Sequence, residues 1–409
     1  MKDRRKFLRL SLAGGAALTS CSTTEKNGGG PASKTAAVED DGPDQLGKAV
    51  SAYGERSPHD KTARLVPDTK TPATASSRTP LAETYGIITP NSLHFERHHA
   101  GIPKIDPAEH KLLIHGMVDR PLVFTLADLK RLPSVSRVHF MECAGNSGGE
   151  WGVKNAPDVQ RSHGLASCAE WTGVPLRLLF EEAGLQKDAK WFLAEGADAC
   201  KMSRSVPVAK AMDDAMIAYA QNGEAIRPEQ GYPLRLVLPG YEGNINVKWL
   251  RRIKAAAEPF YTKDETSKYT ELLPDGKAMI FTLPMDAKSV VTRPSGGQKL
   301  TGPGFHEITG LAWSGRGKIA KVEVSVDGGA TWKPAQLQDP IYSKAFTRFR
   351  LPWAWDGKEA RIVSRCWDDT GYQQPTREEL VAARGANSNY HCNVLKSWTV
   401  AADGSVSNA

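Results

Sequence analysis

The stretch "HFMECAGNSGGEW", from His139 to Trp151, places Cys143 between an apolar, strand-like run and a glycine-rich turn. Three roles suit a cysteine there: a small buried hydrophobe, one half of a disulfide, or a metal ligand. A thiolate is a soft, strongly donating ligand, so the third role would bring metal chemistry to this turn. The residues elsewhere in the chain must decide between these roles.

Basic side chains gather in "FERHHAGIP", where Arg97, His98 and His99 are adjacent. A zinc site would need further ligands at a readable spacing, which the segment does not offer. Guanidinium pairs with phosphate or another oxyanion in a planar fork. The cluster therefore fits an anion-binding role better than a zinc site.

The cysteine spacing limits the chemistry further. No CxxC pair occurs, which argues against zinc and thioredoxin-type sites, and no CxxCH occurs, so we expect no haem on this chain. Cys168 is expected near the site, either as a thiol that meets the substrate or as a packed side chain. The sequence does not reveal whether Cys168, Cys200, Cys366 and Cys392 form disulfides.

Two regions of different pattern must position these residues. In the first, strand-like runs such as "KLLIHGMV" and "LRLVLPG" alternate with short helical segments such as "TLADLKRLP" and "PLRLLFEEAGL". In the second, valines alternate at 322, 324 and 326 before an Asp-Gly-Gly turn at 327–329, which is a hairpin signal. Short strands with regular turns favour an immunoglobulin-like sandwich. We therefore expect an α+β chain, with a mixed α/β domain over 85–283, a β-sandwich over 284–400 and a tail over 401–409.

The first 21 residues have the pattern of an export signal. An Arg-Arg pair at positions 4 and 5 precedes a short apolar stretch over 10–18, as in a twin-arginine signal. "LTSC" also fits a lipobox in which Cys21 would be lipidated, and a soluble product cut nearby fits equally well. We expect a periplasmic protein, with residues 22–84 as a flexible linker and arm because they are rich in Gly, Ser, Thr and Pro.

The formal net charge is +7, from 53 Lys and Arg against 46 Asp and Glu. These cations are spread along the chain and no nucleic-acid motif occurs, so we expect no nucleic-acid partner. A solvated basic surface or attraction to an acidic partner or substrate explains the charge.

Six segments together favour the metal role of Cys143. "FERHH", "MECAGNSGG", "AEGAD", "YPLRLVLPG", "NVKWLRRIK" and "SKYTELL" occur in the order and spacing of the sulfite oxidase family of molybdenum enzymes, which the chain resembles over about 85–400. "RSHGLASCAEWTGVPL" is more similar to its sulfane dehydrogenase branch than to animal sulfite oxidases. The resemblance implies a mixed α/β molybdopterin domain, an immunoglobulin-like dimerisation domain that pairs two copies, and one molybdenum–molybdopterin cofactor per chain.

The resemblance also implies roles for individual residues. Cys143 falls on the molybdenum ligand, Tyr269 on the active-site tyrosine, and Arg97 faces both pterin and oxyanion; these three are the expected catalytic residues. Arg235 and Lys248 can offset a phosphate. The expected cofactor-binding set is Phe95, Arg97, His99, Cys143, Asp198, Arg235, Asn246, Val247 and Lys248.

Four positions depart from the family pattern. Ser147 and Gly148 stand where sulfite oxidases have two arginines, one of which helps to hold sulfite. An ionic hydrogen bond contributes about 1.5–3 kcal/mol, so its loss should weaken sulfite binding by about one to two powers of ten. A glycine would also leave room for a larger substrate. Gln230 replaces a histidine and Ile245 a basic residue, so we expect a pocket that is less cationic than a sulfite site.

The implied activity is a two-electron oxidation of sulfur with water as the oxygen source, in which Arg97 and Tyr269 stabilise the developing oxyanion. The expected substrate is a sulfane sulfur on a carrier-protein cysteine, and the expected acceptor is a separate c-type cytochrome subunit. Two alternatives remain: a sulfite dehydrogenase that acts on free sulfite, and an exported binding scaffold with a vestigial site.

Overall fold

The computed structural model describes residues 48–152, 156–386 and 388–409. The expected export signal, Cys21 and the first part of the linker lie outside these residues. Residues 48–59 belong to one unit, and they contain neither helix nor strand. The second unit, which begins at Asp60, holds every element described below.

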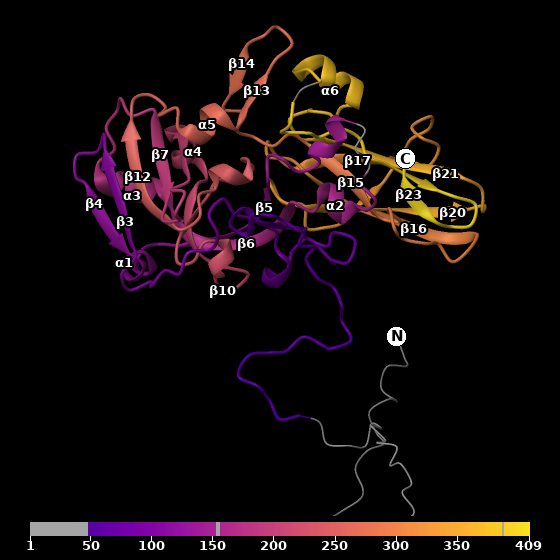
Figure 1. Ribbon diagram of the computed structural model, residues 1–409, viewed down its shortest axis with the longest axis horizontal. Helices are drawn as coiled ribbons and strands as arrows, with labels where there is room; N and C mark the ends of the chain where they lie inside the picture. Colours follow the sequence, from indigo (N-terminus) through magenta and orange to yellow (C-terminus); the bar gives the residue numbers. More distant parts are fainter. Residues whose placement is uncertain (1–47, 153–155, 387) are drawn as a thin grey trace, which may run out of the picture. The chain divides into compact units, whose positions relative to one another are not determined.

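Two sheets build the N-terminal domain (Figure 1). The first has the strand order β4-β3-β12-β7-β8, and the second has the order β10-β9-β6-β5, with β11 also paired to β9. β12 runs parallel to β3 and antiparallel to β7, so the first sheet is mixed. The strands are β3 (Lys111–Gly116), β4 (Leu122–Thr125), β5 (Val135–Glu142), β6 (Ala166–Pro175), β7 (Trp191–Gly196), β8 (Ser203–Pro207), β9 (Met216–Gln221), β10 (Glu224–Ala225), β11 (Arg235–Val237) and β12 (Leu250–Ala256).

Short helices pack against these sheets. α3 (Leu176–Ala183) buries Leu176, Leu179, Phe180 and Ala183, which follow helical spacing on one face. It ends at Gly184, whose φ of 72° suits glycine at a helix C-terminus. The other helices are α1 (Leu126–Arg131), α2 (Val159–His163), α4 (Val208–Asp213), α5 (Lys263–Ser267) and α6 (Arg377–Arg384).

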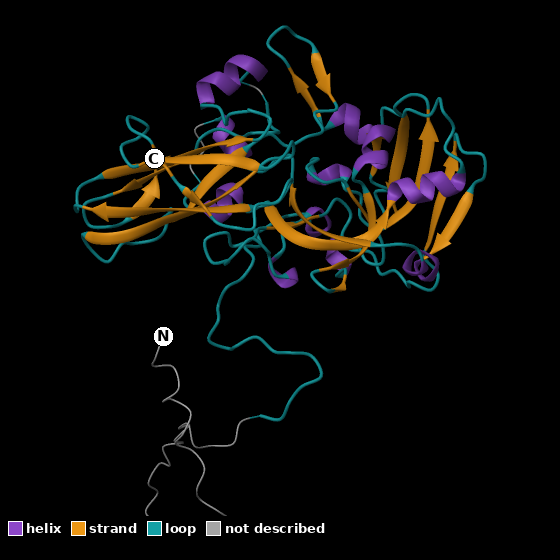
Figure 2. Cartoon of the chain, turned by 180° about the vertical axis from the view of Figure 1, so that it is seen from behind, coloured by secondary structure: helices purple, strands orange, loops and turns teal. Residues whose placement is uncertain are grey.

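The C-terminal domain is a β-sandwich, which Figure 2 shows as two layers of strands. One sheet has the order β15-β16-β20-β19 and the other β18-β17-β21-β22-β23. Their facing side chains form one core that contains Ile308, Phe349, Val322 and Trp398. The strands are β15 (Lys288–Arg293), β16 (Gly304–Trp313), β17 (Ile319–Ser325), β18 (Lys333–Pro334), β19 (Gln336–Leu337), β20 (Thr347–Trp355), β21 (Ala360–Asp368), β22 (Ser397–Val400) and β23 (Val406–Asn408).

Two small sheets border the region between these domains. β1 (Ser76–Ser77) pairs with β2 (Glu96–Arg97), so part of the expected flexible arm is a strand beside the "FERHH" segment. β13 (Thr270–Leu272) and β14 (Ala278–Ile280) form a hairpin directly after Tyr269.

The expected α+β class, with a sandwich after a mixed domain, is confirmed. The predicted hairpin at the Asp-Gly-Gly turn is present as β17 and β18, and Val322 and Val324 are buried. One detail differs: β23 lies in the stretch expected as a tail, and its pairing with β22 makes it part of the sandwich. Within the described ranges, no helix has the length and apolarity needed to cross a bilayer.

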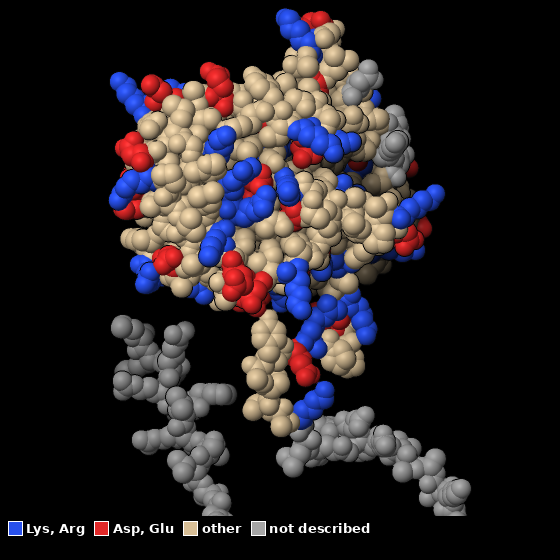
Figure 3. Space-filling view, turned by 60° about the vertical axis from the view of Figure 1, so that its left-hand side comes forward, with Lys and Arg blue, Asp and Glu red and all other residues tan. Residues whose placement is uncertain are grey.

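Charged side chains of both signs share the surface. Figure 3 shows Lys and Arg interspersed with Asp and Glu on one face. Glu195 of β7, for example, pairs with both Arg251 and Arg252 of β12. Pairs of this kind offset much of the positive charge locally, because opposite charges lie within contact distance.

Candidate active site

One cavity in the described chain brings together residues from six separate segments. They come from β2, the end of β5, the β7–β8 connection, β11, the segment before β12 and the end of α5. Every expected site residue lines this cavity: Phe95, Arg97, His99, Cys143, Asp198, Arg235, Asn246, Val247, Lys248 and Tyr269. The structure thus places them together, and the role of each stays a prediction.

Cys143 is the first residue after β5, and its thiol borders the cavity. Its backbone N–H donates to the Leu165 carbonyl at 3.0 Å, and its carbonyl accepts from the Asn146 N–H at 2.8 Å. Burial raises the pKa of the thiol. The segment around Gly243 packs tightly against this residue, since a Cβ on Gly243 would lie 2.8 Å from the Glu142 carbonyl oxygen. The turn therefore holds the thiol in one place.

A buried network lies behind this turn. The Glu142 carboxylate accepts from the Lys288 ammonium at 2.5 Å, from Trp313 Nε1 at 2.7 Å and from Asn146 Nδ2 at 2.9 Å. Lys288 also donates to Ser147 Oγ at 2.9 Å. Glu142 and Lys288 are at most 1% exposed, so each charge depends on the other. The second domain thereby fixes the turn that carries Cys143.

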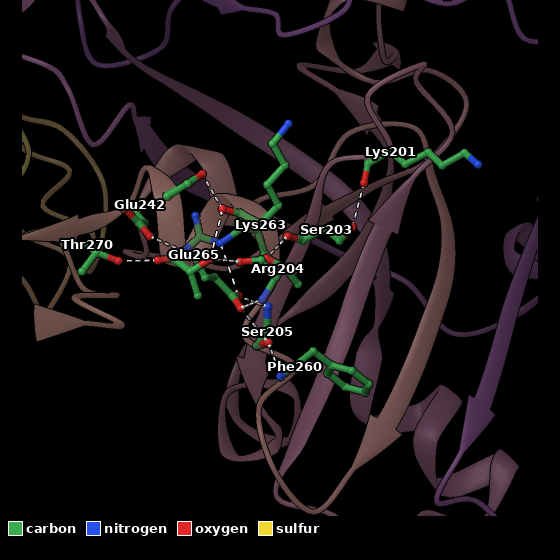
Figure 4. A network of polar contacts seen from close by, with 12 residues as sticks. Lys201, Ser203, Arg204, Ser205, Glu242, Phe260, Lys263, Glu265 and Thr270 are labelled. Atoms are coloured by element: carbon green, nitrogen blue, oxygen red, sulfur yellow. Dashed lines mark hydrogen bonds and ion pairs between the residues drawn. The ribbon is translucent and has the colours of Figure 1, made fainter. Parts of the chain in front are cut away.

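A second network joins Arg204, Glu242 and Glu265 (Figure 4), and it lies against Tyr269. The buried Arg204 guanidinium lies 4.7 Å from the centre of the Tyr269 ring. It pairs with Glu242 at 2.9 Å and with Glu265 at 3.5 Å. Glu265 also accepts from Ser205 Oγ at 3.0 Å, which ties α5 to β8. Burial raises the pKa of the Tyr269 phenol, so this side chain is a neutral hydrogen-bond donor at physiological pH.

The sandwich domain adds a further aromatic side chain. The Tyr390 ring lies 5.1 Å from that of Tyr269, and it comes from the segment between α6 and β22. Its neighbour His391 donates its backbone N–H to the Ala144 carbonyl at 2.8 Å, and its Nε2 lies 3.2 Å from a Glu242 carboxylate oxygen. The end of the cavity near Cys143 is therefore built by both domains.

Two basic side chains, Arg235 and Lys248, also line the cavity. Arg235 is 2% exposed, and its guanidinium donates to the Gln230 carbonyl at 2.8 Å and to the Met141 sulfur at 2.7 Å. The mostly buried Lys248 donates to the Glu229 carbonyl at 3.0 Å and contacts His98 Nδ1 at 3.0 Å. Among the described residues, no carboxylate forms an ion pair with either cation. Burial lowers the pKa of Lys248 to about 7 and that of Arg235 to about 9.

The "FERHH" segment is held by the arm. Arg64 pairs with Glu96, and Glu96 contacts His98 Nε2 at 2.7 Å. Arg97 donates to the Thr74 carbonyl at 2.7 Å. Burial lowers the pKa of His99 to about 4, so its imidazole is neutral at physiological pH.

The remaining expected residues differ in what they can offer a ligand. Asp198 is buried, and its carboxylate already accepts from the Met202 N–H and from the Cys200 thiol. The Asn246 side chain bonds three backbone groups of the loop before it, at Leu238, Tyr241 and Glu242. Its geometry thus supports the loop rather than presenting a free amide.

Two of the residues that depart from the family pattern, Ile245 and Gly148, have surroundings that differ from those expected. Ile245 is fully buried in the hydrophobic core of the N-terminal domain, so it does not affect the cavity's charge. Gly148 does not leave open room, because a Cβ there would lie 3.0 Å from the Asn389 carbonyl oxygen. Gln230 does line the cavity, and its amide donates to the Phe95 carbonyl at 2.8 Å.

The cysteines other than Cys143 are unpaired thiols in the described chain. Cys168 is fully buried in the hydrophobic core, so of its two expected roles the packed one applies. Cys200 is exposed, and Cys366 and Cys392 are buried. No group of His, Cys, Asp and Glu among the described residues could enclose a metal ion by itself.

The donor set nevertheless fits a molybdenum–molybdopterin cofactor. Neither Arg235 nor Lys248 pairs with a carboxylate of the described chain, and Arg235 Nε makes no hydrogen bond there, which suits a terminal phosphate. Cys143 offers one thiolate, which suits a metal that takes its other ligands from the cofactor. Asp198 can accept from pterin N–H groups.

Comparison with known proteins identifies the family. Residues 99–263 match the model of the oxidoreductase molybdopterin binding domain, and residues 279–397 match that of the Mo-co oxidoreductase dimerisation domain. Chicken sulfite oxidase is 31% identical over 72% of this chain and 69% of its own length. The chain belongs to the sulfite oxidase family of molybdenum-cofactor oxidoreductases.

Other relatives refine the similarity. Mouse mitochondrial sulfite oxidase is 32% identical over 75% of this chain, which spans 61% of that protein's length. The crystal structure of the sulfane dehydrogenase SoxCD from Paracoccus pantotrophus is 45% identical. It superposes with a TM-score of 0.87 and covers 90% of this chain and 96% of that one.

Several side chains of the site were not predicted from the sequence. Three of them, Arg204, Tyr390 and Lys288, lie outside every quoted motif, and each acts through a contact distant in sequence. Glu142 carried a readable signal, because a carboxylate at the end of the apolar run before Cys143 must be paired if that strand is buried.

Proposed function

We propose that this protein is a sulfane dehydrogenase, which oxidises sulfane sulfur bound to a cysteine of a carrier protein. The observation that carries the proposal is the set of side chains that share the cavity. Arg235 and Lys248, which pair with no carboxylate of the described chain, line it together with the Cys143 thiol and the Tyr269 phenol. The similarity to SoxCD supports sulfane sulfur as the substrate class.

The residues would divide the work as follows. A bound molybdenum–molybdopterin cofactor would supply two-electron redox chemistry at a metal centre. Lys248 and Arg235 would hold its phosphate, and Cys143 would bind its metal. Arg97 and Tyr269 would donate hydrogen bonds to the oxyanion that develops on the substrate.

The reaction balances with water as the oxygen source. The two-electron step converts R–S–S⁻ and H₂O to R–S–SO⁻, two protons and two electrons. A new S–O bond forms, the outer sulfur is oxidised, and the electrons pass singly to a c-type cytochrome subunit. The charge and position of Arg97 suit an oxygen atom that gains negative charge during the step.

Oxidation of free sulfite is the second candidate function. Identities of 31–32% to sulfite oxidases favour it. The absence of a basic side chain at Gly148 opposes it, because one ionic hydrogen bond to the anion is missing.

A turnover comparison tests the proposal. The molybdenum-loaded enzyme is assayed with persulfidated carrier protein and with sodium sulfite, using a c-type cytochrome as acceptor. We expect kcat/KM to be higher for the carrier-bound sulfur. Efficient turnover of sulfite alone would overturn the proposal, and purified protein without near-stoichiometric molybdenum would favour the scaffold alternative.

The cellular setting is part of the proposal. The twin-arginine pattern supports export to the periplasm, where a cytochrome partner and a sulfur carrier would meet the enzyme. The match of residues 279–397 to a dimerisation domain supports a homodimer. Gel filtration with light scattering checks the homodimer, and fractionation of expressing cells checks the location.

A further inference from the structure

We propose that Tyr390 makes the surroundings of Cys143 selective for a sulfur chain on a thiol over a free dianion such as sulfite. This inference rests on the proposed function and deepens it by naming a residue that chooses the substrate class. Tyr390 would thus be a specificity-determining residue that the second domain contributes.

The first argument for this role is the position of the Tyr390 ring. Its centre lies 5.1 Å from that of Tyr269, and the two planes are inclined by 43°. A Cβ on Gly145 would lie 4.0 Å from both the Cys143 sulfur and the Tyr390 ring. The ring and the thiol therefore flank the same glycine, and the ring packs against Tyr269, which lines the cavity.

The segment that carries Tyr390 is fixed in place. The Tyr390 carbonyl accepts from Trp151 Nε1 at 3.0 Å, and the Cys392 carbonyl accepts from Ser147 Oγ at 2.7 Å. These bonds join both ends of the segment to the turn after Cys143. The ring is therefore preorganised, so a substrate that uses it need not order a loop.

The second argument is the distribution of charge around Tyr269. The Arg204 guanidinium lies under Tyr269, but the Glu242 and Glu265 carboxylates offset its charge. A dianion gains little at such a site, whereas Arg97 alone suffices for a singly charged oxygen.

The aromatic pair suits sulfur chemically. A divalent sulfur makes favourable contacts with aromatic rings, and two tilted tyrosine rings provide such a surface beside the thiol. The Tyr390 hydroxyl adds a hydrogen-bond donor to this surface.

The test uses Tyr390→Ala and Tyr390→Phe in the molybdenum-loaded enzyme. kcat and KM are measured for glutathione persulfide and for sodium sulfite with ferricyanide as acceptor. We expect Tyr390→Ala to lower kcat/KM for the persulfide roughly tenfold, through KM, with sulfite unchanged or improved. Tyr390→Phe should stay within about threefold of the wild type. An equal fall for both substrates, or an unchanged ratio in Tyr390→Ala, overturns the inference.

A binding measurement separates this inference from the proposed function. Calorimetry with sodium sulfate on Tyr390→Arg, with matched metal content and thermal midpoint, reports affinity for a dianion without turnover. We expect roughly tenfold tighter binding than in the wild type. If the wild type fails to oxidise the persulfide, the proposed function falls, yet tighter sulfate binding would still uphold the role of Tyr390. Unchanged sulfate affinity would overturn that role whatever the wild type oxidises.

Discussion

Buried cations form two groups in this protein. Lys288 and Arg204 each meet a buried carboxylate, Glu142 in one case and Glu242 in the other. In the other group, Arg235 and Lys248 meet carbonyl oxygens, a thioether sulfur and an imidazole, but no carboxylate among the described residues. Both groups lie within the same N-terminal domain or at its border.

The presence or absence of a carboxylate partner distinguishes cations that stabilise the fold from cations that can bind a ligand. A buried ion pair satisfies itself, and breaking it leaves the partner charged in a medium of low polarity. A buried cation without an anion is an uncompensated charge, and a bound phosphate can compensate it. The paired group should therefore govern stability, and the unpaired group should govern ligand affinity.

The largest effect is expected from the paired group. Lys288→Met leaves the Glu142 carboxylate unpaired, so we expect a loss of about 3–5 kcal/mol in the free energy of unfolding. Denaturant titration of the cofactor-free protein measures it. The double variant with Glu142→Gln should recover part of the loss, and a loss below that of an exposed pair would contradict the comparison.

The next effect concerns the unpaired group. Lys248→Met should weaken cofactor retention about 10- to 100-fold, which corresponds to one ionic hydrogen bond of about 1.5–3 kcal/mol. The stability of the cofactor-free protein should stay unchanged or rise, since an uncompensated cation is removed. Molybdenum content after dialysis, together with the unfolding curve, checks both parts. A marked loss of stability without loss of retention would place Lys248 in the structural group.

A smaller effect follows from the pKa of Lys248, which burial lowers to about 7. Between pH 7 and its ordinary value near 10.5, the unfolded chain binds this proton and the folded chain does not. Stability of the cofactor-free wild type should therefore rise with pH relative to Lys248→Met, by up to about 1.4 kcal/mol per pH unit. Denaturant titrations of both proteins at pH 7 and pH 9 measure the difference. If the free energy of unfolding changes equally with pH in the two proteins, the pKa of Lys248 is not lowered.

The smallest effect is expected at the surface. Arg120 and Glu182 pair at 3.0 Å with both side chains more than 60% exposed. Arg120→Ala should change the free energy of unfolding by less than about 1 kcal/mol, because water screens the pair. The same titration measures it and sets the baseline for the buried variants. A loss comparable to that of Lys288→Met would erase the distinction between buried and exposed pairs.

The sequence predicts the parts of this site that depend on local pattern or on motif order. The "ECAGN" and "SKYTELL" segments led to Cys143 and Tyr269, and both line the cavity. Alternation of apolar residues likewise predicts the sandwich strands, since burial on one face repeats every second residue.

Contacts between distant backbones could not be predicted in this way. Nothing near Gly148 indicates that the Asn389 carbonyl lies against it, because the contact depends on how a segment about 240 residues away folds back. The pairing of Lys288 with Glu142 joins two domains and leaves no periodic signal. A sequence motif names the residue types at a site, whereas their distant neighbours follow from the fold.

The bonds between residues 390–392 and the turn after Cys143 have a consequence for truncated chains. A chain that ends before Tyr390 would keep every predicted site residue, yet it would lose the three hydrogen bonds by which the C-terminal segment holds this turn. The last twenty residues of the sequence therefore belong to the support of the Cys143 thiol as well as to the sandwich.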